Sequence, residues 1–302
     1  MSTLPATAPD AAIDPDAKSS IKGRLRSLPS QFSGRFWFAL ALTIGVVLFA
    51  FLGPFLTSIE NPDRIVGGLY LEPSAEAWLG TDNFGKDVFT QLMYGTRTSL
   101  IIGVISGLIA TLIGVIIGIS AGFYGGIIEE VMMGITNVVI TIPSIVVLIL
   151  LSIAIGSRSI YSIAIIIGVT SWPWTARAVR AQASSVRTRE HVDLARLTGA
   201  NTFSLMIWEV LPYMLSYIVM AFVLQLTSGI LQEAALSMLG LGPSNSISLG
   251  IMLFWALLWE SIRTGAWWAF VPPTIFLTLI AFTLLLLQSS LDEVFNPRLR
   301  RS

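Results

Sequence analysis

Long apolar stretches alternate with short polar segments along most of this chain of 302 residues. A helix needs roughly 20 apolar residues to cross the hydrocarbon layer of a bilayer. The stretches that meet this length predict spanning helices at 36–56, 98–123, 131–155, 160–179, 213–235 and 267–287. A shorter apolar piece, Ile251–Trp259, predicts a re-entrant or interfacial helix. The pattern therefore predicts an all-α integral membrane protein with about six transmembrane helices.

Composition agrees with a lipid environment. Apolar residues make up 54% of the chain and charged residues 12%, against roughly 25% charged in soluble domains. The mean hydropathy is +0.77. The net charge is zero, so the sequence gives no reason to expect a nucleic-acid partner. There is no Cys and one His, His191, so neither a metal site nor catalytic residues are predicted.

Glycines recur every fourth residue in the second predicted span. The pairs 103/107, 114/118 and 118/122 put small residues on one face, which allows two helices to approach closely in lipid. This spacing predicts tight packing inside the membrane. In the fourth predicted span, Pro173 lies between two tryptophans and is expected to bend or end the helix.

Basic residues indicate the orientation in the membrane. With the amino terminus inside, the inner segments hold 13 of the 18 Lys and Arg residues. We therefore expect a cytoplasmic tail at 1–35, partly disordered, a transmembrane domain at 36–290 and a cytoplasmic tail at 291–302. The acidic loop 57–95 is expected outside, where it contacts another protein, folds as a cap or is simply solvated. Segment 187–212 is expected inside.

That inner segment reads RTREHVDLARLTGANTFSLMIWEVLP and predicts a short helix at 189–199. Glu190 suits its first turn, and Gly199 suits its end. One face is small and smooth, and another is charged. Such a helix fits a groove in a partner protein, although a lipid-surface helix or a solvated loop has the same pattern. The candidate docking residues are Glu190, Val192, Asp193, Ala195, Arg196 and Gly199.

Polar residues also occur within the fifth predicted span. Intramembrane polar side chains are costly, so Gln225, Thr227, Ser228 and Gln232 are candidates for a substrate pathway. Hydrogen bonding between helices is the alternative explanation. Glu233 follows directly, and the sequence does not assign it to lipid, cavity or loop.

The inner segment resembles the "EAA" coupling motif of permease subunits in ABC importers. The motif has Glu-Ala-Ala, then Gly four residues later, then Leu-Pro. Here Asp193-Leu194-Ala195 precedes Gly199 and Leu211-Pro212, so the first two positions of the triplet differ.

Other stretches narrow the resemblance to the dipeptide/oligopeptide/nickel branch and its C-type permease. Residues 79–88, LGTDNFGKDV, are similar to the external LGTDxxGRD signature, with Lys86 where Arg is usual. Residues 94–100, 172–180, 233–242 and 296–300 are similar to later signatures of the same branch. The similarity covers about 79–301.

This resemblance implies the type I ABC importer permease fold, with a cytoplasmic coupling helix between spans four and five. It implies a second homologous permease, two cytoplasmic ATPase subunits, an external substrate-binding protein and the lipid bilayer as partners. The chain lacks a GxxxxGK[ST] loop, so ATP and Mg are expected on the ATPase subunits and no cofactor on this chain.

The implied substrates are peptides, with oligosaccharides or a metal chelate as alternatives. Two other classes fit the sequence less well. An ion-coupled carrier or channel usually has ionisable residues in mid-span, and the predicted spans have almost none. An intramembrane hydrolase needs a catalytic constellation inside the bilayer, and the only His is in the inner segment.

Overall fold

The computed structural model describes residues 33–56 and 61–295, so most of the expected tail 1–35 lies outside the described residues. The described part is helical, as predicted, with two isolated β-bridges in the loop before α3. In chain order the helices are α2 (Gly34–Leu56), α3 (Val88–Tyr124), α4 (Gly126–Thr141), α5 (Ser144–Ile155), α6 (Ile160–Arg187), α7 (Glu190–Leu197), α8 (Thr202–Ser204), the π-helix η2 (Leu205–Val210), α9 (Leu211–Met238), α10 (Leu249–Leu258) and α11 (Trp267–Phe295).

Four helical segments of the described residues are long and apolar enough to cross a membrane. They are Gly34–Phe55, Val88–Tyr124, Thr202–Met238 and Trp267–Glu293, and they contain most of predicted spans one, two, five and six. The bent pair α4 and α5 makes a fifth if it is counted as one span. The short helix predicted at Ile251–Trp259 is present as α10.

Several predicted boundaries were wrong because the helices extend beyond the apolar stretches that predicted them. α3 begins at Val88 instead of at Thr98, since Asp87 caps it by accepting a hydrogen bond from the Thr90 N–H at 2.7 Å. The loop predicted at 57–95 therefore ends at Asp87, the N-cap of α3. α11 continues to Phe295, so the predicted tail 291–302 begins as helix.

The helix break occurs at a different proline from the one predicted. The stretch 131–155, predicted as one span, breaks between α4 and α5 with a bend of 84°. Pro143 lies in the break, and a proline disfavours helical geometry at the residue before it, here the extended Ile142. Pro173, by contrast, lies inside an uninterrupted α6. α6 packs against α3 and α9, and neighbouring helices help a membrane helix to tolerate an internal proline.

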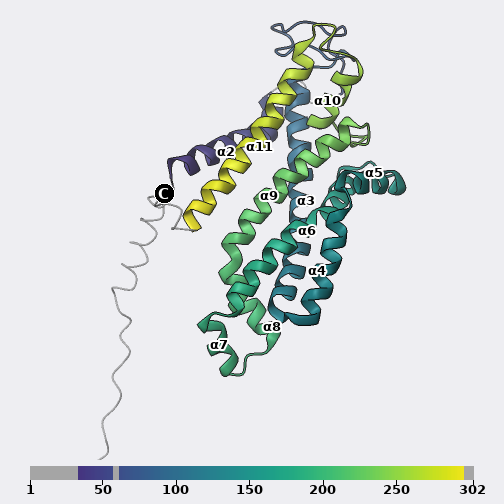
Figure 1. Cartoon of the computed structure of the whole chain (residues 1–302). Helices are drawn as coiled ribbons and strands as arrows, with labels where there is room; N and C mark the ends of the chain where they lie inside the picture. The colour runs from purple at the N-terminus through teal and green to yellow at the C-terminus, as the bar shows by residue number, and fades with distance from the viewer. Residues whose placement is uncertain (1–32, 57–60, 296–302) are drawn as a thin grey trace, which may run out of the picture.

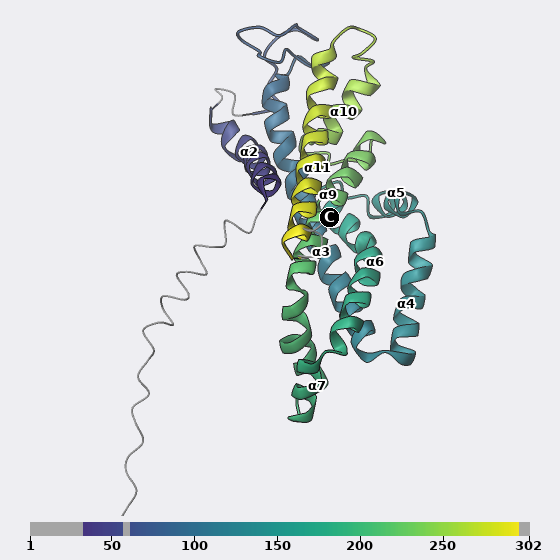
Figure 2. The same cartoon turned by 60° about the vertical axis from the view of Figure 1, so that its left-hand side comes forward.

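α3 forms the centre of the bundle, in contact with α2, α6 and α9 (Figure 1). α2 and α11 lie side by side on one flank, and α4 and α5 lie on the other (Figure 1); Figure 2 shows α4 and α5 standing apart at the edge of the bundle. α7 lies at one end of the molecule, far from α10 and the loop 61–87 at the opposite end.

The glycines of α3 allow neighbouring helices to approach closely, as their spacing predicted. A Cβ atom on Gly107 would lie 2.8 Å from the backbone nitrogen of Leu226 in α9. A Cβ on Gly118 would lie 2.7 Å from the carbonyl oxygen of Ala176 in α6. Close packing of α3 against its neighbours is thus confirmed. Glycines 103 and 107 face α9, whereas 114, 118 and 122 face α6.

Candidate functional site

The predicted inner helix is present as α7, with the expected signals at both ends. Glu190 and Asp193 lie in its first turn, and Arg196 lies in its last turn, 2.9 Å from Asp193. Gly199 has φ +90°, and the Ala200 N–H donates to the Ala195 carbonyl at 3.1 Å. These two features are those of a Schellman motif, in which glycine ends a helix without strain.

The smooth face of α7 is covered at its centre, which corrects the prediction for Val192 as a docking residue. Val192 is 0% exposed and packs with Val186, Leu205 and Val210, which belong to the ends of α6 and η2. Ala195 packs against the same cluster. The physical reason is that this apolar face is covered by the chain's own neighbouring helices, so Val192 is unavailable to a partner.

The face that α7 does expose carries two leucines that the prediction missed. Leu194 is 64% exposed and Leu197 is 85% exposed, and Asp193 and Arg196 beside them are also exposed. Their exposure follows from their offset from Val192 around the helix, so the periodicity could have found them. The outward surface of α7 is therefore apolar at its centre and charged at its edge.

Further contacts fix α7 to the start of α9. The His191 ring stacks on the Tyr213 ring with centroids 4.0 Å apart, and the Arg189 guanidinium lies 5.9 Å from the same ring. The π-helix η2 lies between α7 and α9 in the chain and ends just before Leu211 and Pro212. A proline frees a backbone carbonyl in a membrane helix, and a local π-turn is one way to pair it again. α7 is thus held against both α6 and α9.

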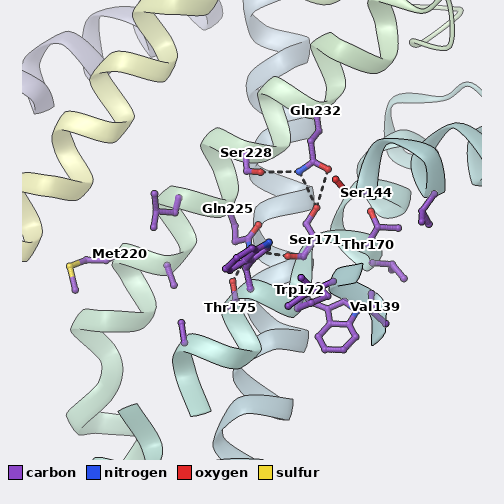
Figure 3. Close-up of a pocket in the computed structure, with 18 of the residues that line it drawn as sticks. Val139, Ser144, Thr170, Ser171, Trp172, Thr175, Met220, Gln225, Ser228 and Gln232 are labelled. Atoms are coloured by element: carbon purple, nitrogen blue, oxygen red, sulfur yellow. Dashed lines mark hydrogen bonds between the residues drawn. The ribbon is translucent and has the colours of Figure 1, made fainter. Parts of the chain in front are cut away.

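A cavity of about 930 Å³ lies between α6, α9, the α4–α5 bend and α11 (Figure 3). Apolar groups dominate its lining, which includes Trp172 and Trp174 of α6. Its polar groups are mostly hydroxyls and carboxamides. They include Gln225, Ser228 and Gln232, three of the four predicted pathway residues.

Two of these predicted residues also bridge α9 to α6. The Gln225 amide donates to the Thr175 hydroxyl at 2.6 Å and to the Ser171 carbonyl at 3.1 Å. The Gln232 amide donates to the Ser171 hydroxyl at 3.1 Å and to the Ser228 hydroxyl at 2.9 Å, and Figure 3 shows these side chains meeting. The sequence offered a substrate pathway or interhelical hydrogen bonding as explanations for these polar residues. In the structure the same residues line the cavity and form interhelical hydrogen bonds.

Thr227, the fourth predicted pathway residue, lies outside this cavity. It is 3% exposed, does not line the cavity and donates to the Val223 carbonyl of its own helix at 2.9 Å. The prediction also missed Trp172, Thr175, Gln288 and Asp292, which line the cavity from α6 and α11. Gln288 and Asp292 were overlooked because they lie at or beyond the end of the last predicted span.

Glu233, which the sequence left unassigned, lies in a buried polar cluster away from the cavity. It is 0% exposed, and its carboxylate accepts hydrogen bonds from Ser99 at 3.0 Å, Ser237 at 2.6 Å and Ser248 at 2.6 Å. These serines belong to α3, α9 and the cap of α10. The cluster therefore ties three helices together.

The loop 61–87 folds as a cap on the end of the bundle opposite α7. The Thr81 carbonyl accepts from the Trp268 indole at 3.0 Å, and the Phe84 ring lies 5.1 Å from that of Trp255. The Tyr70 hydroxyl donates to the Trp259 carbonyl at 3.3 Å. Burial, and then the negative charge of Asp82, raise the pKa of the Tyr70 phenol, which keeps this donor protonated.

Comparison with known proteins gives consistent matches. The family described as "Binding-protein-dependent transport system inner membrane component" matches residues 114–301. The dipeptide transport system permease protein DppC of Bacillus subtilis is 35% identical over 263 residues, covering 87% of this chain and 81% of that protein.

Two oligopeptide permeases match to a similar extent. OppC of Bacillus subtilis is 30% identical over 263 residues, and AmiD of Streptococcus pneumoniae is 30% identical over 273 residues. Each alignment covers 87% of this chain and 85% of the relative. The matched family region includes α6, α7 and α9, which form the cavity wall and its attached short helix. The chain therefore belongs to the family of binding-protein-dependent transport system inner membrane components, a family of membrane permeases, as the sequence motifs indicated.

Proposed function

We propose that this chain is a permease subunit of an ATP-driven importer and that, with a second related permease, it forms the pathway for peptides delivered by an external binding protein. The named relatives are dipeptide and oligopeptide permeases, which favours peptides over oligosaccharides or metal chelates. The chain itself is non-catalytic and binds no cofactor. Two ATPase subunits on the cytoplasmic side bind ATP and Mg.

The observation that carries this proposal is the packing of α7 against the ends of the two helices that line the cavity. Val192 is buried between the ends of α6 and η2, and His191 stacks on Tyr213 of α9. A movement imposed on α7 by an ATPase subunit is therefore passed to α6 and α9 together. Gln225 and Gln232 bridge the same two helices, so this movement would reshape the cavity.

The outward leucines of α7 give the first test. Replacing Leu197 with Asp is expected to weaken ATPase binding by about tenfold or more, because a charge would replace an apolar contact at the centre of the docking surface. The measurements are the amount of ATPase subunit that co-purifies with the permease pair and the ATP-dependent uptake of a labelled peptide by proteoliposomes.

Leu239 supplies a matched control, since it is 56% exposed at the opposite end of α9. Leu239→Asp should retain the ATPase subunits. Normal ATPase binding and normal uptake by Leu197→Asp would contradict the role proposed for α7. If the wild-type complex takes up no peptide, the proposed substrate is wrong.

Orientation can be tested directly because the chain contains no cysteine. We propose that α7 and both termini face the cytoplasm of the cell that carries the protein in its inner or plasma membrane. Thr198→Cys should then resist a membrane-impermeant thiol reagent in intact cells, whereas Glu76→Cys in the cap should be labelled. Both positions are exposed, and labelling after membrane disruption controls for access. The reverse pattern would refute this orientation.

A further inference from the structure

The cavity follows one face of α9 over a long distance. Its α9 residues recur three or four positions apart, and they are Tyr217, Met220, Ala221, Leu224, Gln225, Ser228 and Gln232. From Tyr217 to Gln232 the helix rises about 22 Å at 1.5 Å per residue. An extended peptide of roughly six residues has the same length.

One end of this cavity is charged. Asp292 of α11 is the only charged side chain among the described residues that line it, and it shares that end with Tyr217 and Gln288. Its carboxylate forms no ion pair with any described residue. The adjacent Glu293 pairs with Arg35 at 3.5 Å and does not line the cavity.

Asp292 is half-buried at the end of α11, and a carboxylate beside apolar walls is less screened than one in open water. It therefore attracts a positively charged group that enters this end of the cavity. The other polar lining groups are neutral, and carboxamides such as those of Gln225 and Gln288 can hydrogen-bond to peptide groups. The cavity is complementary to an extended chain of amides that carries a positive charge near one end.

We infer that Asp292 is a specificity-determining residue that favours peptides with a positively charged side chain over neutral and acidic ones. The inference rests on the proposed function and deepens it. An amino-terminal ammonium group is common to ordinary peptides, so a carboxylate in the pathway discriminates among them through their side chains.

The test compares the wild-type complex with Asp292→Asn in proteoliposomes supplied with ATP and the same binding protein. Three labelled peptides of one length carry Lys, Gln or Glu at the same inner position. The binding protein's own preference cancels when each peptide's uptake by the variant is divided by its uptake by the wild type. We expect this ratio to be about three- to tenfold lower for the Lys peptide than for the Gln peptide, and highest for the Glu peptide.

Two further variants separate charge from structure. Asp292→Glu should restore the preference for Lys, and Glu293→Gln should change the uptake of all three peptides equally or not at all. An equal ratio for the three peptides in Asp292→Asn would overturn the inference while leaving peptide transport intact. Absence of all peptide uptake in the wild type would instead count against the proposed function.

Discussion

Replacing Glu233 with Ala is expected to lower the free energy of unfolding by at least about 3 kcal/mol, because three buried hydroxyl groups would lose their acceptor. Each orphaned buried donor costs roughly 1–3 kcal/mol. Ser237 and Ser248 donate to one carboxylate oxygen, and Ser99 donates to the other. Alanine has neither oxygen, so all three hydroxyl groups lose this acceptor. The substitution also leaves a cavity at a fully buried position.

Thermal unfolding of the permease in mild detergent measures this effect, with an expected fall in midpoint of about 5 °C or more. Glu233→Gln keeps the size and one acceptor oxygen, so it should lie between Ala and the wild type. Glu76→Ala, at an exposed acid of the cap, is the control and should melt like the wild type. If Glu233→Ala and Glu76→Ala had equal midpoints, the cluster would not contribute to stability.

The same cluster fixes the position of α10. The Ser99 hydroxyl accepts from the Leu249 N–H at 3.2 Å while donating to Glu233, and the Ser248 hydroxyl caps α10 by accepting from the Ile251 N–H at 3.1 Å. Each of these two serines thus joins the start of α10 to the carboxylate. Because α10 also carries Trp255, which contacts the Phe84 ring, loss of Glu233 should loosen the cap on this end of the bundle.

Elements that are specified by local signals could be predicted from the sequence. The apolar stretches predicted the long helices, and Glu190 with Gly199 predicted α7 and its end. Asn201 likewise caps α8 by accepting a hydrogen bond from the Ser204 N–H at 2.8 Å. Helix capping and helix length depend on residues close in sequence, so predictions of these two features need no knowledge of tertiary contacts.

Features that depend on neighbouring helices were predicted less well. Pro143 and Pro173 carry the same local chemistry, yet one lies in a sharp break and the other lies in an uninterrupted helix. Packing decides between these outcomes, and α6 is enclosed by α3 and α9, whereas α4 and α5 stand at the edge of the bundle. A single sequence does not show which helix is enclosed.

The residues of the cavity were predicted in part. Gln225, Ser228 and Gln232 recur at intervals of three and four, which places them on one face of α9, whereas Thr227 lies off that face. Helical periodicity alone would have separated Thr227 from the three cavity-lining residues. The sequence showed that Val192 lies on an apolar face of α7 but did not show what covers that face. In the structure, η2 and the end of α6 cover it.

Replacing Gly118 with Leu is expected to prevent the normal packing of α3 on α6, with an expected cost of about 3 kcal/mol or more. A Cβ at this position would lie 2.7 Å from both the Ala176 carbonyl oxygen and the Val179 Cβ. The first of these atoms is backbone and the second is next to it, so neither can rotate away. The expected result is poor yield of folded permease and a strongly lowered melting temperature in detergent.

Gly134 of α4 is the matched control, because nothing lies within 4 Å of a Cβ built on it. Gly134→Leu should be neutral or slightly stabilising, since leucine has the higher helix propensity. Gly118→Ala should fall between the wild type and Gly118→Leu. If Gly118→Leu and Gly134→Leu behaved alike, α3 and α6 would not be in close contact, and α6 could not transmit a movement of α7 along the wall of the cavity. The contrast between these two glycines therefore tests the packing on which the proposed coupling depends.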